Sequence, residues 1–186
     1  SKSAFEASEG RYLHADPTRQ SDLAHRYQEL GPGPLVGICW RSGNPIAGGE
    51  RSAPLDLWGA ILTQAPCRFI SLQYGEVAED ISDVKKRLGV DIHVDSRVNP
   101  LESADDWFAQ IGAMDLVISV DNSTIQVSGS QGVPTWTLLS FVPEWRFGRE
   151  GAEHDWHPSL RVYRQLAPGD WHAVFDSVGA DFTEWL

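Results

Sequence analysis

The chain has 186 residues, and its 15 basic and 26 acidic residues give a formal net charge of −11. This negative charge argues against a nucleic acid or an anionic membrane surface as the main partner, but it permits a local basic pocket for one small anion. No segment approaches the roughly 18 apolar residues of a membrane span. Two cysteines without a CxxC pair predict no disulfide framework and fit a reducing, cytoplasmic compartment.

Predicted strands and helices alternate along the chain. The first helix spans 17–30 and ends at the GPGP segment 31–34, so residues 1–32 are predicted to form an amino-terminal segment with a linker, and 33–186 one domain. Apolar runs of strand length follow at 35–40, 67–73, 90–94, 115–120, 134–139 and 160–165. Further helices are predicted at 52–65, 77–88, 103–114, 123–131 and 170–185.

Several helix ends carry recognisable signals. Asp16 precedes Pro17 as an N-cap, Ser103 with Asp106 is typical of a capping box, and Gly89 is placed to end a helix. Segments 41–53 and 140–158 have no such pattern and are predicted to be loops.

Four of the predicted strands are nearly continuous apolar runs, which is typical of a parallel sheet covered on both faces. Cys39 and Cys67 fall within such runs and are interpreted as small core residues. Right-handed crossovers then favour an α/β fold with a Rossmann-like, doubly wound parallel sheet of about six strands in the order 3-2-1-4-5-6.

Ligands of such sheets bind at the carboxyl ends of the strands that flank the switch point, here strands 1 and 4. The loop after strand 1 carries Arg41 and Arg51, and arginine suits bidentate phosphate binding. The turn after strand 4, residues 121–124, opens a helix whose amides favour a phosphate. The alternatives are solvated surface arginines and a simple helix cap at Asp121 or Asn122.

Other motifs point to no cofactor or metal. The glycines of 31–37 precede their strand, whereas a dinucleotide fingerprint follows one. His154 and His157 form an HxxH pair in a loop, a weak metal signal without a third ligand, so no metal is predicted. Trp145 and Trp156 either wall a pocket or pin the long loop to the body.

The order of the motifs resembles the C-terminal half of GT-B glycosyltransferases, in particular the heptosyltransferase-like domains that follow tetratricopeptide repeats in bacterial proteins. The resemblance covers about residues 33–186. It rests on VGICWRSGNP, RSAPLDLWGAIL, FISLQYGEVAED, DLVISVDNSTIQVSGSQGVPTW and VPEWRFGREG.

The resemblance implies binding of a nucleotide-sugar donor substrate, without a further cofactor. The family's turn reads roughly D-[TS]-[AG]-x-x-H-L-A-G and contacts the donor diphosphate, and Gln126 stands here at the usual histidine. The loop after strand 1 would face the phosphates, and Gln73 and Tyr74 would lie near the nucleoside. The residues expected to bind the donor are Arg41, Ser42, Gly43, Arg51, Gln73, Tyr74, Asp121, Asn122, Ser123, Thr124 and Gln126.

A GT-B enzyme has two Rossmann-like domains, and this length accommodates one. The resemblance therefore implies the donor half of a glycosyltransferase with an unknown acceptor, whose partner is the amino-terminal half of the same polypeptide or a repeat domain. The alternative is a binding or scaffolding module that keeps the half-fold without turnover, as Gln126 suggests. A nucleotide-sugar epimerase is disfavoured by the missing dinucleotide fingerprint.

Overall fold

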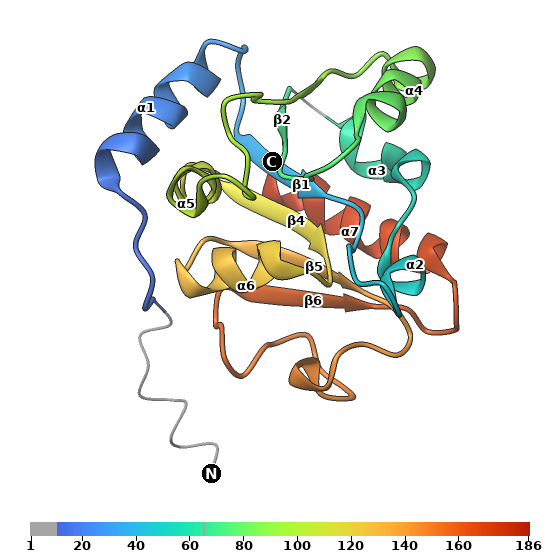
Figure 1. Ribbon diagram of the computed structural model, residues 1–186. Coiled ribbons are helices and arrows are strands. Elements are labelled where there is room, and N and C mark those ends of the chain that lie inside the picture. Colours follow the sequence, from blue (N-terminus) through green and yellow to red (C-terminus); the bar gives the residue numbers. More distant parts are fainter. Residues whose placement is uncertain (1–10, 65) are drawn as a thin grey trace.

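The computed structural model describes residues 11–64 and 66–186 and contains one six-stranded sheet in the order β3-β2-β1-β4-β5-β6 (Figure 1). All five neighbouring pairs run parallel. This confirms the doubly wound parallel sheet and its predicted strand order. The strands are β1 Leu35–Cys39, β2 Arg68–Ser71, β3 Ile92–His93, β4 Leu116–Val120, β5 Thr135–Leu139 and β6 Leu160–Arg164.

Helices cover both faces of the sheet (Figure 1). They are α1 Pro17–Gln28, α2 Gly48–Arg51, η2 Leu55–Trp58, α3 Gly59–Leu62, α4 Ala78–Leu88, α5 Ala104–Gly112, α6 Ser123–Ser130, η3 Trp145–Phe147 and α7 Trp171–Trp185. Three predictions were wrong in detail. The single helix expected over 52–65 is a 3₁₀ turn followed by a short α-helix, the expected loop 41–53 contains α2, and the expected loop 140–158 contains the 3₁₀ turn η3.

The core has two halves, one on each face of the sheet. Because side chains alternate along a strand, Val36 and Ile38 of β1 pack with η2, α3, α4 and α7, while Leu35 and Cys39 pack with α1, α5 and α6. Burial on both faces explains why the central strands read as continuous apolar runs. Cys67 departs from its prediction, since it precedes β2 and is only half-buried.

The predicted helix ends are confirmed, although Ser103 acts as an N-cap only: its own amide donates to the Asn99 carbonyl and does not close a capping box with Asp106. Asp16 Oδ1 accepts hydrogen bonds of 2.9 Å from the amides of Thr18 and Arg19, and Ser103 Oγ accepts one of 3.2 Å from Asp106. Gly89 ends α4 with a φ of 70°, which favours glycine. Among the described residues, no helix is long and apolar enough to cross a membrane.

Candidate functional site

A cavity of about 540 Å³ opens at the carboxyl ends of β1 and β4, which is the switch point of the sheet. Its walls come from the loops after β1, β2, β4 and β5 and from α2 and α6. The residues that line it are Ser42, Gly43, Asn44, Arg51, Tyr74, Asp121, Asn122, Ser123, Gln126, Val127, Glu144 and Arg146.

The amino-terminal end of α6 forms one wall of the cavity. Asn122 caps this helix, and its Oδ1 accepts 2.9 Å from the Thr124 amide. Ser123 is exposed at the first helical position, and the first turn carries no acidic residue. The partial positive charge of the helix end is therefore not neutralised by the helix itself, which favours an anion at this wall.

Asn122 also ties α6 to the loop after β1. Its Nδ2 donates 3.1 Å to the Arg41 carbonyl and 3.0 Å to Cys39 Sγ, while Ser119 Oγ donates 3.1 Å to its Oδ1. One side chain thus fixes the register between the two loops at the switch point. The sequence left open the alternative that Asn122 only caps a helix. In the structure it caps α6 and also joins that helix to the loop after β1.

Arg51 and Asp121 form an ion pair on the cavity wall, with 3.4 Å between Arg51 NH1 and Asp121 Oδ2. The Asp121 side chain is only 3 % exposed. Burial raises the pKa of Asp121, and the neighbouring Arg51 guanidinium opposes that shift. Arg51 stands at the end of α2, so this unpredicted helix is what brings the arginine into the cavity.

The loop after β5 supplies two lining residues that were not predicted from the sequence, Glu144 and Arg146, which form an ion pair with each other. The Glu144 amide donates 3.4 Å to Asp121 Oδ2. The signal that could have identified them is topological: β5 lies next to β4, so the loop that follows it must reach the same edge of the sheet.

Tyr74 lines the cavity, and its hydroxyl lies against the loop after β1 at Gly43, which has no side chain. A Cβ at Gly43 would lie 2.3 Å from the Tyr74 hydroxyl oxygen. Glycine is therefore required at this position for the phenol to pack as it does. Ser42, behind it, is held by a 3.0 Å hydrogen bond from its amide to Ser52 Oγ.

Three of the expected donor-binding residues are not among those that line the cavity. The Arg41 guanidinium turns away to Asp80, at 3.3 Å, and to the Glu76 carbonyl. Gln73 is buried and accepts 2.7 Å from the Arg41 amide through Oε1, so it supports the loop from behind. Thr124 is 2 % exposed, and its side chain hydrogen bonds to Cys39.

Three lining side chains keep nitrogen donors that have no partner within the described structure. They are Arg51 Nε, Gln126 Nε2 and Arg146 Nε, and each atom is buried. Buried donors are almost always satisfied in folded proteins, so unsatisfied ones mark a place where an acceptor belongs. Such atoms occur elsewhere in the described chain too, for example Arg26 Nε and Arg68 Nε, but three of them gather around this cavity, where they would suit a ligand rich in oxygen acceptors.

The loop residues whose role was left open in the sequence do not line the switch-point cavity. Trp145 and Trp156 contact each other with ring centroids 6.1 Å apart, and neither lines the cavity. His154 and His157 are both buried. Within residues 11–64 and 66–186, no group of three or more His, Cys, Asp or Glu side chains is arranged to hold a metal ion.

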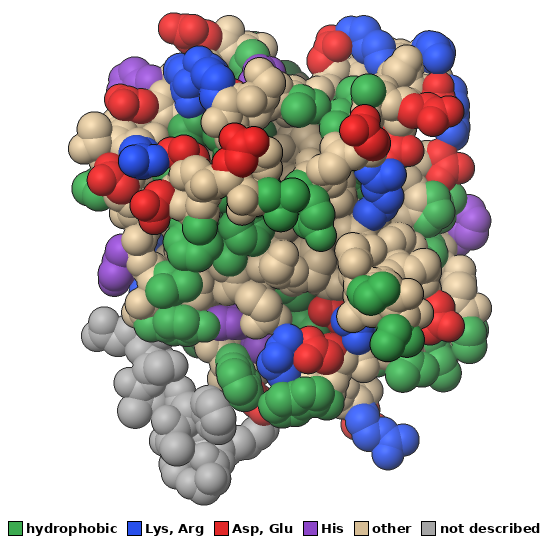
Figure 2. All heavy atoms as spheres, in the orientation of Figure 1, with side chains coloured by type: hydrophobic (Ala, Val, Ile, Leu, Met, Phe, Trp, Pro, Cys, Tyr) green, Lys and Arg blue, Asp and Glu red, His purple; other side chains and the backbone are tan. Residues whose placement is uncertain are grey.

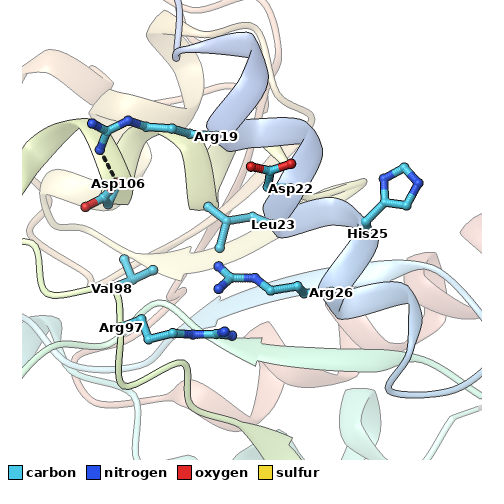
Figure 3. A pocket seen from close by; sticks show the side chains of 8 residues that line it. All are labelled: Arg19, Asp22, Leu23, His25, Arg26, Arg97, Val98 and Asp106. Atoms are coloured by element: carbon cyan, nitrogen blue, oxygen red, sulfur yellow. Dashed lines mark hydrogen bonds and ion pairs between the residues drawn. The ribbon is translucent and has the colours of Figure 1, made fainter.

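A second cavity, of about 600 Å³, lies between α1, α5 and the loop after β3 (Figure 3). Its three arginines already have carboxylate partners: Arg19 pairs with Asp106, while Arg26 and Arg97 pair with Asp95. The nearby α5 also carries acidic residues in its first turn. Arg51 and Arg146 of the switch-point cavity are paired with carboxylates as well, so the two cavities differ in the helix end: the first turn of α5 is acidic and that of α6 is not. The second cavity is a seam of ion pairs that holds α1 on the domain, and we do not assign it a ligand.

Asp95 pairs with both Arg26 and Arg97 in that seam. We predict that the contribution of Asp95 to the free energy of unfolding is lost in acid. Burial alone would raise its pKa, but hydrogen bonds from Arg97 and Tyr27 outweigh burial and lower it. A carboxyl group whose pKa is lower in the folded state stabilises the fold at pH values above its unfolded-state pKa. This stabilisation is lost as the pH falls from there through the folded-state pKa. Asp95→Asn should lower the free energy of unfolding by about 2 kcal/mol at pH 7.

The measurement is urea unfolding of both proteins at pH 7 and near pH 3. The difference between wild type and Asp95→Asn should shrink as the pH falls below the ordinary aspartate pKa, because the unfolded chain then binds a proton at Asp95 before the folded protein does. A difference that stays constant across this range would contradict an ionic role for Asp95.

The face of the molecule drawn in Figure 2 does not resemble a site for a polyanion. Figure 2 shows acidic and basic side chains interspersed on one face of the described part of the molecule, without a continuous basic area there. This distribution agrees with the net charge of −11. A small anion in the switch-point cavity is the binding mode that the charges favour.

Comparison with known proteins gives one curated relative and several solved structures. Protein FlbA of Caulobacter vibrioides is 33 % identical over 168 residues, which cover 90 % of this chain and 28 % of FlbA. No protein-family model matches the chain. The chain thus spans little more than a quarter of the relative that it resembles in sequence.

Similar solved structures include glycosyltransferases. A glycosyl transferase family 9 structure from Veillonella parvula superposes with a TM-score of 0.69 at 13 % identity, covering 96 % of this chain and 56 % of that one. The ADP-heptose LPS heptosyltransferase II of E. coli gives 0.66 at 12 % identity, covering 93 % and 54 %. E. coli heptosyltransferase WaaC with ADP-2-deoxy-2-fluoro heptose gives 0.58 at 13 % identity, covering 88 % and 48 %.

At these identities the likeness concerns the fold, and the chain again spans about half of the matched structures. The strand order and the superpositions agree. The chain is a domain with a glycosyltransferase-like fold.

Proposed function

We propose that this chain is the nucleotide-sugar binding domain of a glycosyltransferase, with the donor diphosphate in the switch-point cavity. The observation that carries the proposal is the set of unpartnered donors on Arg51, Gln126 and Arg146 beside the uncompensated amino-terminal end of α6. Diphosphate oxygens accept hydrogen bonds and carry charge, so they match both features.

In the proposed reaction, an acceptor displaces the nucleoside diphosphate from the sugar carbon. The leaving diphosphate gains charge as the bond breaks, and donors already in place stabilise that charge without reorganising. Arg51, Arg146, Gln126 and the α6 amides would supply this stabilisation. The acceptor site and the catalytic base would come from another part of a longer polypeptide, its amino-terminal half or a repeat domain.

The test is isothermal calorimetry of the folded chain with ADP, UDP and GDP and their sugars. ADP compounds come first, because the E. coli structural neighbour acts on ADP-heptose. Saturable binding of at least one of them supports the proposal. Absence of binding by every one, both with this chain and with a longer natural polypeptide, would contradict it.

Ser123→Asp is predicted to weaken nucleoside diphosphate binding about tenfold without weakening the fold. The new carboxylate would stand at the exposed first position of α6 and repel the diphosphate. An acidic residue in the first turn also favours the helix dipole, so the free energy of unfolding should not fall. Calorimetry and urea unfolding separate the two effects, and unchanged affinity would show that the phosphate lies elsewhere.

A second candidate, a binding or scaffolding module without turnover, is favoured by one observation: Gln126 lines the cavity where the resemblance expects a histidine. Glutamine cannot carry a charge or transfer a proton at this position. Sugar transfer by the longer polypeptide would eliminate this candidate, whereas nucleotide binding without transfer would favour it.

A further inference from the structure

His157, from the loop after η3, reaches the cavity-lining Gln126 from behind. Its Nε2 lies 3.3 Å from Gln126 Oε1, and its side chain is buried against α6. Gly129, one turn after Gln126, makes room for the ring, since a Cβ there would lie 2.6 Å from His157 Cγ. The imidazole therefore has a built position directly behind the cavity wall.

The His157 ring is fixed by its neighbours as well. His154 stacks on it with ring centroids 5.2 Å apart and an interplanar angle of 6°, and Tyr12 lies 5.9 Å away with its ring also stacked. His154 Nδ1 accepts 3.1 Å from the His157 amide and 3.3 Å from the Trp156 amide. The ring is held by aromatic contacts and by the loop backbone together, which suits a residue that orients another group.

We infer that His157 donates through Nε2 to Gln126 Oε1 and so fixes the Gln126 amide with only N–H groups left for a ligand. His157 is then a positioning residue, and Gln126 is a neutral donor to an anionic oxygen in the cavity. This inference rests on the proposed function, because it assigns one donor to the ligand proposed there.

The hydrogen-bond inventory favours this orientation over the flipped amide. When Gln126 Oε1 points to His157 Nε2, two atoms are left without a partner: His157 Nδ1, which carries only a lone pair, and Gln126 Nε2, which carries two hydrogens. The flipped amide would donate to His157 Nε2 and require a proton on Nδ1, which would leave an unpartnered N–H on a residue that does not line the cavity. The unpartnered Gln126 hydrogens of the inferred orientation belong to a residue that does line it, where a ligand can supply acceptors. The flipped amide would also present a carbonyl oxygen to the cavity, where an anion would be repelled.

The protonation state of the ring agrees with a single donated proton. Burial, and then the charge of Arg146, lower the pKa of His157. Burial, with His157 next, lowers the pKa of His154 to about 4. Both rings are therefore neutral at pH 7, and His157 carries a single N–H, either on Nδ1 or on Nε2.

The experiment measures binding of inorganic pyrophosphate and of ADP to the full chain by calorimetry. His157→Leu should weaken both about tenfold, because the freed amide loses its orientation. His157→Gln should recover most of that loss, since its amide nitrogen can occupy the place of Nε2. Gln126→Glu keeps the acceptor for His157 and removes the donor, so it should weaken binding more than His157→Leu. His172→Leu, on the exposed side of α7, is the matched control.

Nitrogen-15 spectra of the histidine rings give a readout that does not depend on a ligand. His157 should show a protonated Nε2 and an unprotonated Nδ1, and a protonated Nδ1 would overturn the inference. If folded His157→Leu bound both probes as tightly as the wild type, the inference about His157 would be overturned. The proposed function would not be affected by that result. If the wild type binds neither probe nor any other nucleoside diphosphate, the proposed function fails, and the donor role of Gln126 fails with it.

Discussion

Arg51→Ala is expected to lower the affinity for a nucleoside diphosphate about a hundredfold. Two effects act in the same direction. The variant removes a guanidinium from the cavity wall, and it leaves the buried Asp121 carboxylate, which had been 3.4 Å from Arg51, without its cation. An entering diphosphate then meets an unpaired negative charge in a poorly solvated place, where repulsion is strong.

The second effect gives the variant a pH signature. Burial already raises the pKa of Asp121, and removing Arg51 raises it further, because the arginine was opposing the shift. A carboxyl group with a raised folded-state pKa becomes protonated as the pH falls through that value. Part of the lost affinity should therefore return in mildly acidic buffer, and Arg51→Ala combined with Asp121→Asn should recover that part at pH 7.

Arg41→Ala is the matched control for this experiment. Arg41 also belongs to the loop after β1, but its guanidinium faces Asp80 and Glu76 instead of the cavity. Calorimetry should show little change for Arg41→Ala. If Arg51→Ala and Arg41→Ala lost equal affinity for the nucleoside diphosphate, binding would depend on the overall positive charge of the loop and not on the position of Arg51 in the cavity wall.

The fold was predictable because its signals are local and repeated. The runs that became β1, β2, β4 and β5 are nearly continuously apolar since both of their faces are covered, and right-handed crossovers in a doubly wound sheet favour the order 3-2-1-4-5-6. Short elements were not predictable in this way. The helix α2 has four residues and no side-chain cap, so it leaves no periodicity for a pattern to detect.

The position of the switch-point cavity was predictable, and the side chains that line it were less so. The loops after β1 and β4 do meet in one cavity, because the carboxyl ends of adjacent parallel strands share an edge. The direction of a long side chain depends on neighbours far along the chain, such as Asp80 for Arg41. Arg146 was missed for the same reason, since only the path of the long loop after β5 brings it to the cavity.

Asn122→Ala is expected to weaken the fold and the site together. The variant loses the cap on the Thr124 amide and the hydrogen bonds to the Arg41 carbonyl and Cys39 Sγ. We expect the free energy of unfolding to fall by about 2–3 kcal/mol. We also expect nucleoside diphosphate affinity to fall more than tenfold, because the two loops would no longer be held in register.

Asn122→Ser separates these two roles. Serine caps a helix about as well as asparagine, but its hydroxyl is too short to reach the Arg41 carbonyl across the cavity edge. In urea unfolding, Asn122→Ser should therefore regain much of the stability that Asn122→Ala loses. In calorimetry, Asn122→Ser should still bind the nucleoside diphosphate more weakly than the wild type. If serine restored affinity in full, the cap alone would organise the site. If alanine left affinity unchanged, the tie between the two loops would have no part in binding, and the preorganised α6 amides would have to act without it.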